Sequence, residues 1–122
     1  MSDISTDYTL LIVESPTLGR QIQEIVPDNV LVLSTGGYLW KPVFDPDTDS
    51  LRTKALPEKL DLRRRLREES RYTAKIIIAT DDDPSGAFIA WSICKALKPD
   101  RILRGQLTAV SHRSIDTLLN HA

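Results

Sequence analysis

The sequence lacks paired cysteines, long apolar runs and a net charge of either sign. Cys94 is its single cysteine, so no internal disulfide can form, and we expect a small buried thiol. The formal net charge of −1 gives no overall attraction to polyanions, so nucleic-acid contact would need local patches or a bound cation. No run approaches the ~20 apolar residues that cross a bilayer, and the N-terminus does not resemble a signal peptide. We therefore expect a soluble, cytoplasmic protein without a membrane partner.

The length and composition are those of one compact domain. The chain has 122 residues, of which 41% are hydrophobic and 27% charged. That is enough for one hydrophobic core and too little for two. Residues 1–122 are therefore predicted to form a single domain.

Apolar runs of strand length alternate with helical patterns along the chain. Strands are predicted at 8–14, 29–34, 74–80 and 101–110, and helices at 15–26, 57–72, 84–97 and 111–122. Ser15 and Ser111 are predicted helix caps, and Pro16 suits the first helical position. Such alternation predicts an α/β fold with about four mostly parallel strands and helices on both faces of the sheet, as in Rossmann-like folds.

The segment from Tyr38 to Leu56 has no clear period. We expect a long loop there, with at most a short hairpin at "DPDTDS". Tyr38, Trp40 and Phe44 in this loop could form an exposed aromatic surface for unpaired bases or a protein partner, or could fold onto the core. Trp91, in a helical pattern, is expected to be buried.

The helix predicted for 57–72 is rich in arginine. Leu62, Leu66 and Tyr72 are expected to face inward. From Arg52 to Arg71 there are eight basic and four acidic residues. A solvated helix face and a nucleic-acid contact both explain that excess.

Carboxylates follow two of the predicted strands. Glu14 closes the first strand, and Asp81, Asp82 and Asp83 close the third. Because the carboxyl ends of parallel strands share one edge of a sheet, both groups are expected at the edge where ligands bind in such folds. Convergent carboxylates select hard cations such as Mg²⁺. The alternative is that Asp82 or Asp83 caps the following helix and the others are solvated.

Two segments, "LLIVESPTLGRQIQEIV" and "IIIATDDDPSGAFIAWSI", resemble the Toprim domain of type IA DNA topoisomerases, with its "VESP" and "ATDxDxEGExIAW" motifs. "VLSTGGYLWKP" and "RGQLTAVSHRSI" are similar to further segments of that family. The resemblance covers nearly the whole chain.

The resemblance implies a role for each matched residue. Glu14 corresponds to the general acid and base that protonates the leaving 3′ oxygen when a tyrosine attacks the DNA phosphodiester. Asp81 and Asp83 correspond to the ligands of Mg²⁺, for which Mn²⁺ could substitute. The residues predicted to contact DNA, expected to be single-stranded, are Ser15, Arg20 and Ser85.

The sequence also departs from the family pattern by losing charged or ionisable groups. Ser85 stands at the third acidic position, and further departures are Leu18, Gly37, Leu39, Trp40, Pro84 and Ala109. These changes predict a weakened or altered metal site. Two of the three acidic ligands remain, which Mg²⁺ tolerates.

The family's nucleophilic tyrosine belongs to a separate domain, so the chain is expected to be a piece of a longer topoisomerase or a stand-alone Toprim protein with a partner. Tyr8, Tyr38 and Tyr72 are expected to be packing residues. Two other functions stay open: a phosphodiesterase resembling Toprim nucleases, and a degenerate Toprim scaffold that binds DNA or protein.

Overall fold

The computed structural model describes residues 8–97, 102–107 and 110–121 of the chain. Its main sheet contains β1 (Thr9–Val13), β2 (Val30–Ser34), β5 (Lys75–Ile78) and β6 (Ile102–Arg104). Its helices are α1 (Pro16–Gln23), the 3₁₀ helix η1 (Pro57–Lys59), α2 (Leu60–Ser70), α3 (Pro84–Leu97) and α4 (His112–His121). The strand order is β2-β1-β5-β6, and every neighbouring pair is parallel. The predicted α/β fold with four parallel strands is confirmed.

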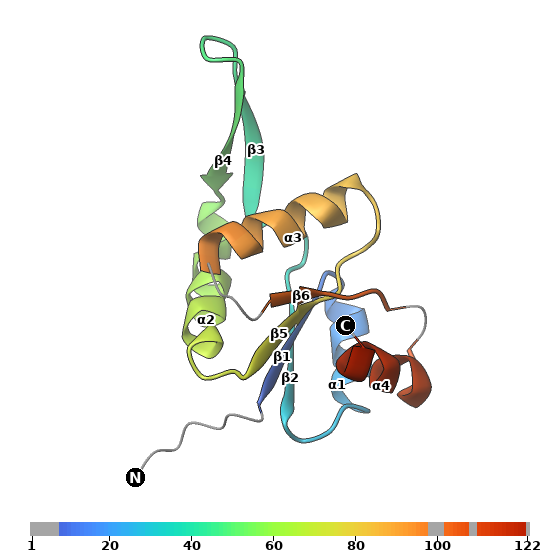
Figure 1. Ribbon diagram of the computed structural model, residues 1–122. Helices are drawn as coiled ribbons and strands as arrows, with labels where there is room; N and C mark the ends of the chain where they lie inside the picture. Colours follow the sequence, from blue (N-terminus) through green and yellow to red (C-terminus); the bar gives the residue numbers. More distant parts are fainter. Residues whose placement is uncertain (1–7, 98–101, 108–109, 122) are drawn as a thin grey trace.

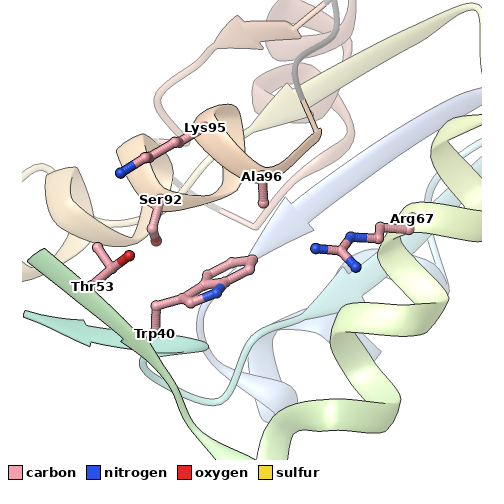
Figure 2. Close-up of a pocket in the computed structure, with 6 residues that line it drawn as sticks. All are labelled: Trp40, Thr53, Arg67, Ser92, Lys95 and Ala96. Carbon is pink, nitrogen blue, oxygen red and sulfur yellow. The ribbon is translucent and has the colours of Figure 1, made fainter.

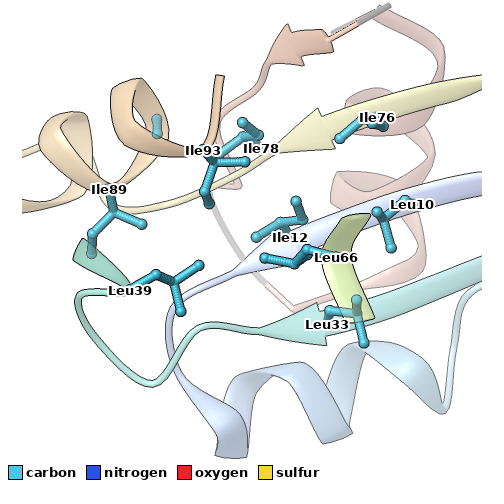
Figure 3. Close-up of a cluster of buried hydrophobic side chains, with 10 residues drawn as sticks. Leu10, Ile12, Leu33, Leu39, Leu66, Ile76, Ile78, Ile89 and Ile93 are labelled. Atoms are coloured by element: carbon cyan, nitrogen blue, oxygen red, sulfur yellow. The ribbon is translucent and has the colours of Figure 1, made fainter. Parts of the chain in front are cut away.

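Helices cover both faces of the sheet (Figure 1). Side chains of β1 alternate between the faces, as the two-residue period of a strand requires. Leu10 and Ile12 pack in one buried cluster with residues of α2 and α3, and Figure 3 shows part of this cluster. Leu11 and Val13 pack in a second cluster with residues of α1 and α4. Two covered faces explain why β1 and most of β5 read as unbroken apolar runs.

The segment expected to be a long loop is a β-hairpin instead. β3 (Trp40–Asp45) pairs antiparallel with β4 (Ser50–Ala55), around a turn within the predicted "DPDTDS" segment. The hairpin projects from the body of the protein (Figure 1), and most of its residues are exposed. The predicted short hairpin at "DPDTDS" has the correct turn, but the length of its strands was missed, because little of the hairpin is buried and its sequence carries no strong apolar pattern.

Several predicted side-chain positions are confirmed. The Oγ atoms of Ser15 and Ser111 accept hydrogen bonds from the N–H groups of Leu18 and Ser114, at 3.1 and 3.2 Å, so both serines cap their helices. Leu66 is buried in the cluster beneath α2, and Leu62 packs against it.

Other predicted positions are wrong. Tyr72 and Trp91 are 50% and 47% exposed, and Cys94 is exposed rather than buried. Tyr72 follows the end of α2. Trp91 lies on the exposed side of α3, although its sequence neighbours Ala90 and Ser92 are buried. Ala109, one of the departures from the family pattern, lies outside the described residues. In the described part of the chain, no helix is long and apolar enough to cross a membrane.

Candidate metal and phosphate site

The carboxyl ends of β1 and β5 lie side by side, because these strands pair in parallel with Ile12 opposite Ile78. Glu14 and Asp81 therefore meet at one edge of the sheet. The backbone N–H of Asp81 donates a hydrogen bond of 2.7 Å to Oε1 of Glu14. The two acidic segments, 67 positions apart in sequence, are thus in direct contact.

The three aspartates at this edge have different partners. Oδ1 of Asp83 accepts a bond of 2.6 Å from the N–H of Gly86, so this carboxylate caps α3. Oδ2 of Asp82 accepts a bond of 3.1 Å from the side-chain amide of Gln106. The side chain of Asp81 is exposed. Within the described residues, no three His, Cys, Asp or Glu side chains gather closely enough to hold a metal ion in the arrangement shown.

A tight turn joins β5 to α3 and sets the direction of the aspartates. Oγ1 of Thr80 donates a bond of 2.8 Å to the carbonyl of Gly86. A Cβ atom at Gly86 would lie 2.7 Å from the carbonyl carbon of Asp81 and nearer still to its oxygen. The start of α3 can therefore approach Asp81 this closely only because residue 86 is glycine.

Arg104, at the end of β6, supports the same turn. Its guanidinium donates to the carbonyls of Thr80 and Asp81, at 2.9 and 3.1 Å, and also to that of Ile78. These bonds fix the backbone beneath the aspartates and bring one positive charge to the acidic edge. No functional role was predicted for Arg104, although it begins the "RGQLTAVSHRSI" segment that resembles the family.

Lys59 brings a second cation to the carboxyl end of β2. Its Nζ donates to the carbonyls of Thr35 and Gly36, at 2.8 and 3.3 Å. Gly36 and Gly37 have φ angles of 64° and 113°, which bend the chain sharply after β2 and aim these carbonyls at the lysine. Lys59 was not predicted either, because nothing in its own segment points to residues more than twenty positions away.

Ser85 and Glu14 line a shallow cavity of about 230 Å³ together with Gly37, Tyr38 and Ile89. The hydroxyl of Tyr38 donates to Oγ of Ser85 at 3.2 Å. The ring of Tyr38 also packs edge-to-face against Phe88. Two hydroxyl groups thus lie beside Glu14 in this cavity.

The other two residues predicted to contact DNA belong to α1. Ser15 lies beside Glu14 at the edge, where its hydroxyl caps the helix. Arg20 lies in the last turn of α1 and donates to Oγ1 of Thr17 at 3.4 Å. The structure thus places Glu14, Ser15, Ser85 and the aspartates at one edge, and Arg20 further along α1.

The chain is similar in sequence to two DNA topoisomerases. The chain is 25% identical to DNA topoisomerase 1 of Mycoplasma pneumoniae over 72% of its own length and 16% of the relative. It is 27% identical to DNA topoisomerase 1 of Zymomonas mobilis subsp. mobilis over 87% of its length and 9% of the relative. It therefore spans less than a fifth of these relatives.

The fold matches full-length topoisomerase I from Thermotoga maritima with a TM-score of 0.78 at 19% identity, over 90% of this chain and 20% of that one. At that identity the match shows a shared fold. Residues 9–113, most of the chain, match the family described as Toprim domain. The chain belongs to the Toprim domain family.

Proposed function

We propose that this domain is the metal- and phosphate-binding part of a type IA topoisomerase-like enzyme that cleaves and rejoins a DNA strand. The nucleophilic tyrosine would come from another domain. The observation that supports this most directly is the 2.7 Å bond from the Asp81 N–H to Glu14, which joins the two acidic segments at the sheet edge. Ligands bind at that edge in parallel α/β folds.

The residues at the edge suit a magnesium ion in their chemistry. Glu14, Asp81 and Asp83 offer only oxygen donors, which hard cations prefer. Mg²⁺ is commonly held by one or two carboxylates together with water and substrate phosphate, so Asp81 and Asp83 are sufficient without a carboxylate at residue 85. The exposed side chain of Asp81 can turn toward the ion without breaking a buried contact. When bound, the ion would neutralise charge on the phosphate.

The chain's own residues would divide the remaining work. Glu14 would hold the proton that passes to and from the leaving 3′ oxygen. Lys59 and Arg104 are fixed by backbone carbonyls on two sides of the edge, and would favour the approach of a phosphate. Ser85 would donate a hydrogen bond to a phosphate oxygen, with its hydroxyl oriented by Tyr38.

Tyr8 fits a supporting role rather than that of a nucleophile. The hydroxyl of Tyr8 donates to Glu69 at 2.9 Å. Burial, and next this hydrogen bond, raise the pKa of Tyr8 well above its usual range, so its hydroxyl resists the loss of a proton that a nucleophile needs. Tyr72 is exposed at the far end of α2.

Calorimetric titration with Mg²⁺ tests the metal site. The parent chain is expected to bind, and the double substitution Asp81→Asn with Asp83→Asn is expected to abolish the heat of binding, because amides are weaker ligands than carboxylates for this ion. Asparagine also caps helices well, so α3 should be preserved in this variant.

The matched control is Asp47→Asn with Asp49→Asn, which removes the same charge from the hairpin turn. This variant should bind Mg²⁺ like the parent. If the parent gives no heat, or if both double variants bind equally, the proposed metal site is wrong. The same titrations with Mn²⁺ test whether that ion substitutes.

A further inference from the structure

A second cavity lies between the hairpin, α2 and α3 (Figure 2). Its volume is about 300 Å³, at the lower limit of pockets that hold small ligands. Each of the three elements contributes to its wall, and the lining residues are Trp40, Thr53, Arg67, Ser92, Lys95 and Ala96. Along α3, Lys95 lies ten residues beyond Ser85, which at 1.5 Å per residue is about 15 Å from the edge.

An aromatic ring lines this cavity. Trp40 is partly buried, and the guanidinium of Arg63 lies 5.7 Å from its ring centre. Arg63 is itself held by the carbonyls of Leu39 and Leu56, so the indole is fixed from one side. A rigid indole with an accessible part is a suitable surface on which a nucleobase can stack.

Two cationic residues line the cavity from different helices. Arg67 extends from α2 toward the indole, and Lys95 lies on α3 (Figure 2). The amino group of Lys95 lies 5.2 Å from the ring centre of Trp91, on the exposed side of α3. Both side chains are exposed, and no carboxylate is among the described residues that line the cavity. Their positive charges are therefore available to an anion.

We propose that this cavity binds one nucleotide unit of a single-stranded nucleic acid. The base stacks on Trp40, and the phosphates on either side of it contact Arg67 and Lys95. Thr53 and Ser92 supply hydroxyl groups beside the base. A nucleotide unit within a strand has one ring and a phosphate on each side of it, as the cavity has one aromatic ring and two cationic residues. An isolated anion would leave the ring unused, and an apolar ligand would leave the cations unused. The site goes beyond the proposed function, because it needs neither the metal nor strand cleavage.

Fluorescence anisotropy with a labelled twelve-residue oligo(dT) tests the site, in EDTA so that the metal site contributes nothing. Arg67→Gln with Lys95→Gln is expected to weaken binding roughly tenfold at low salt, because two charge-assisted contacts are lost. The slope of log affinity against log salt concentration should fall by about 1.4, since each phosphate contact to a single strand contributes about 0.7. The control, Arg64→Gln with Arg113→Gln, removes the same charge from exposed positions and should change either quantity much less.

A second measurement follows Trp40 directly. Trp91→Phe leaves Trp40 as the only tryptophan, and its fluorescence should be quenched as the oligonucleotide saturates the chain. dTMP is the comparison ligand. Quenching by the oligonucleotide alone would show that the cavity requires a strand, and quenching by both would show that it also accepts a free nucleotide. Unchanged Trp40 fluorescence at saturation, or equal affinities of the parent and the Arg67/Lys95 variant, would overturn the proposal. Either result leaves the Mg²⁺ titration unaffected.

Discussion

At the scale of single residues, the turn after β5 shows how backbone contacts bring carboxylates together. The Asp81 N–H binds Glu14, the Asp81 carbonyl accepts from Arg104, and Asp83 caps α3. The capping and metal-binding interpretations of Asp83 are compatible, because its cap uses one carboxylate oxygen, Oδ1. A bond to the backbone also fixes the carboxylate's position before any ion arrives, which lowers the entropic cost of binding.

Gly86→Ala is expected to destabilise the protein although it lies in a helix. In an ordinary helical position this change adds roughly 0.5–1 kcal/mol of stability. Here the new Cβ would collide with the backbone of Asp81, and such overpacking costs roughly 1–3 kcal/mol. Urea unfolding of the parent and the variant measures the difference.

Ala87→Gly is the matched control, one position along the same helix at an exposed residue. It should lose roughly 0.5–1 kcal/mol, as the general helical preference for alanine requires. If Gly86→Ala instead raised the free energy of unfolding, the close approach of α3 to Asp81 would not require glycine at residue 86.

At the scale of elements, the predictions succeeded for the buried strands and were incomplete for the exposed ones. β1 and β5 are buried on both faces and read directly as apolar runs. The hairpin pairs Trp40 with Ala55 and Phe44 with Leu51 on one face, but Phe44 and Leu51 are 59% and 58% exposed. Because so little of the hairpin is buried, the alternation of apolar and polar residues in its sequence was too weak to distinguish strands from a loop.

The candidate site could be predicted in part: its acidic residues were found from the sequence, and its two cations were not. Glu14 and the aspartates follow strand ends, and the parallel sheet determines where those ends meet. Arg104 and Lys59 could not be assigned, because their contacts depend on the register of β6 beside β5 and on how η1 reaches the end of β2. Such long-range positions leave no periodic signal in their own segments.

Arg63→Met is expected to loosen the hairpin from the body. Arg63 is 9% exposed and donates to the carbonyls of Leu39 and Leu56, the residues that flank the two strands. Methionine keeps much of the apolar stem but loses both bonds, which should cost about 2 kcal/mol or more. A two-stranded hairpin has little stability of its own, so amide hydrogen exchange should rise most in β3 and β4.

Arg64→Met, at the exposed neighbouring position, is the control and should change stability by less than about 0.5 kcal/mol. If both variants lost equal stability, or if exchange rose evenly over the whole chain, the hairpin would not depend on Arg63.

At the scale of the whole molecule, the sheet separates two cores that must both be intact. Ile78 belongs to the cluster beneath α2 and α3, and Ile77 to the cluster beneath α1 and α4. Both are fully buried although they are adjacent in the chain. The sheet edge that carries Glu14 and the aspartates therefore depends on both cores, since β5 leads directly into the aspartates.

Ile77→Val and Ile78→Val should each lower the free energy of unfolding by about 0.5–1.5 kcal/mol, since each removes one buried methylene. Leu103→Val on β6 removes the same group from a side chain that is 36% exposed, and should change stability by less than about 0.5 kcal/mol. Urea unfolding compares the three variants with the parent. A sheet with one solvated face would show a loss for only one of the two isoleucines, so an unaffected Ile77→Val variant would mean that α1 and α4 do not cover their face in solution.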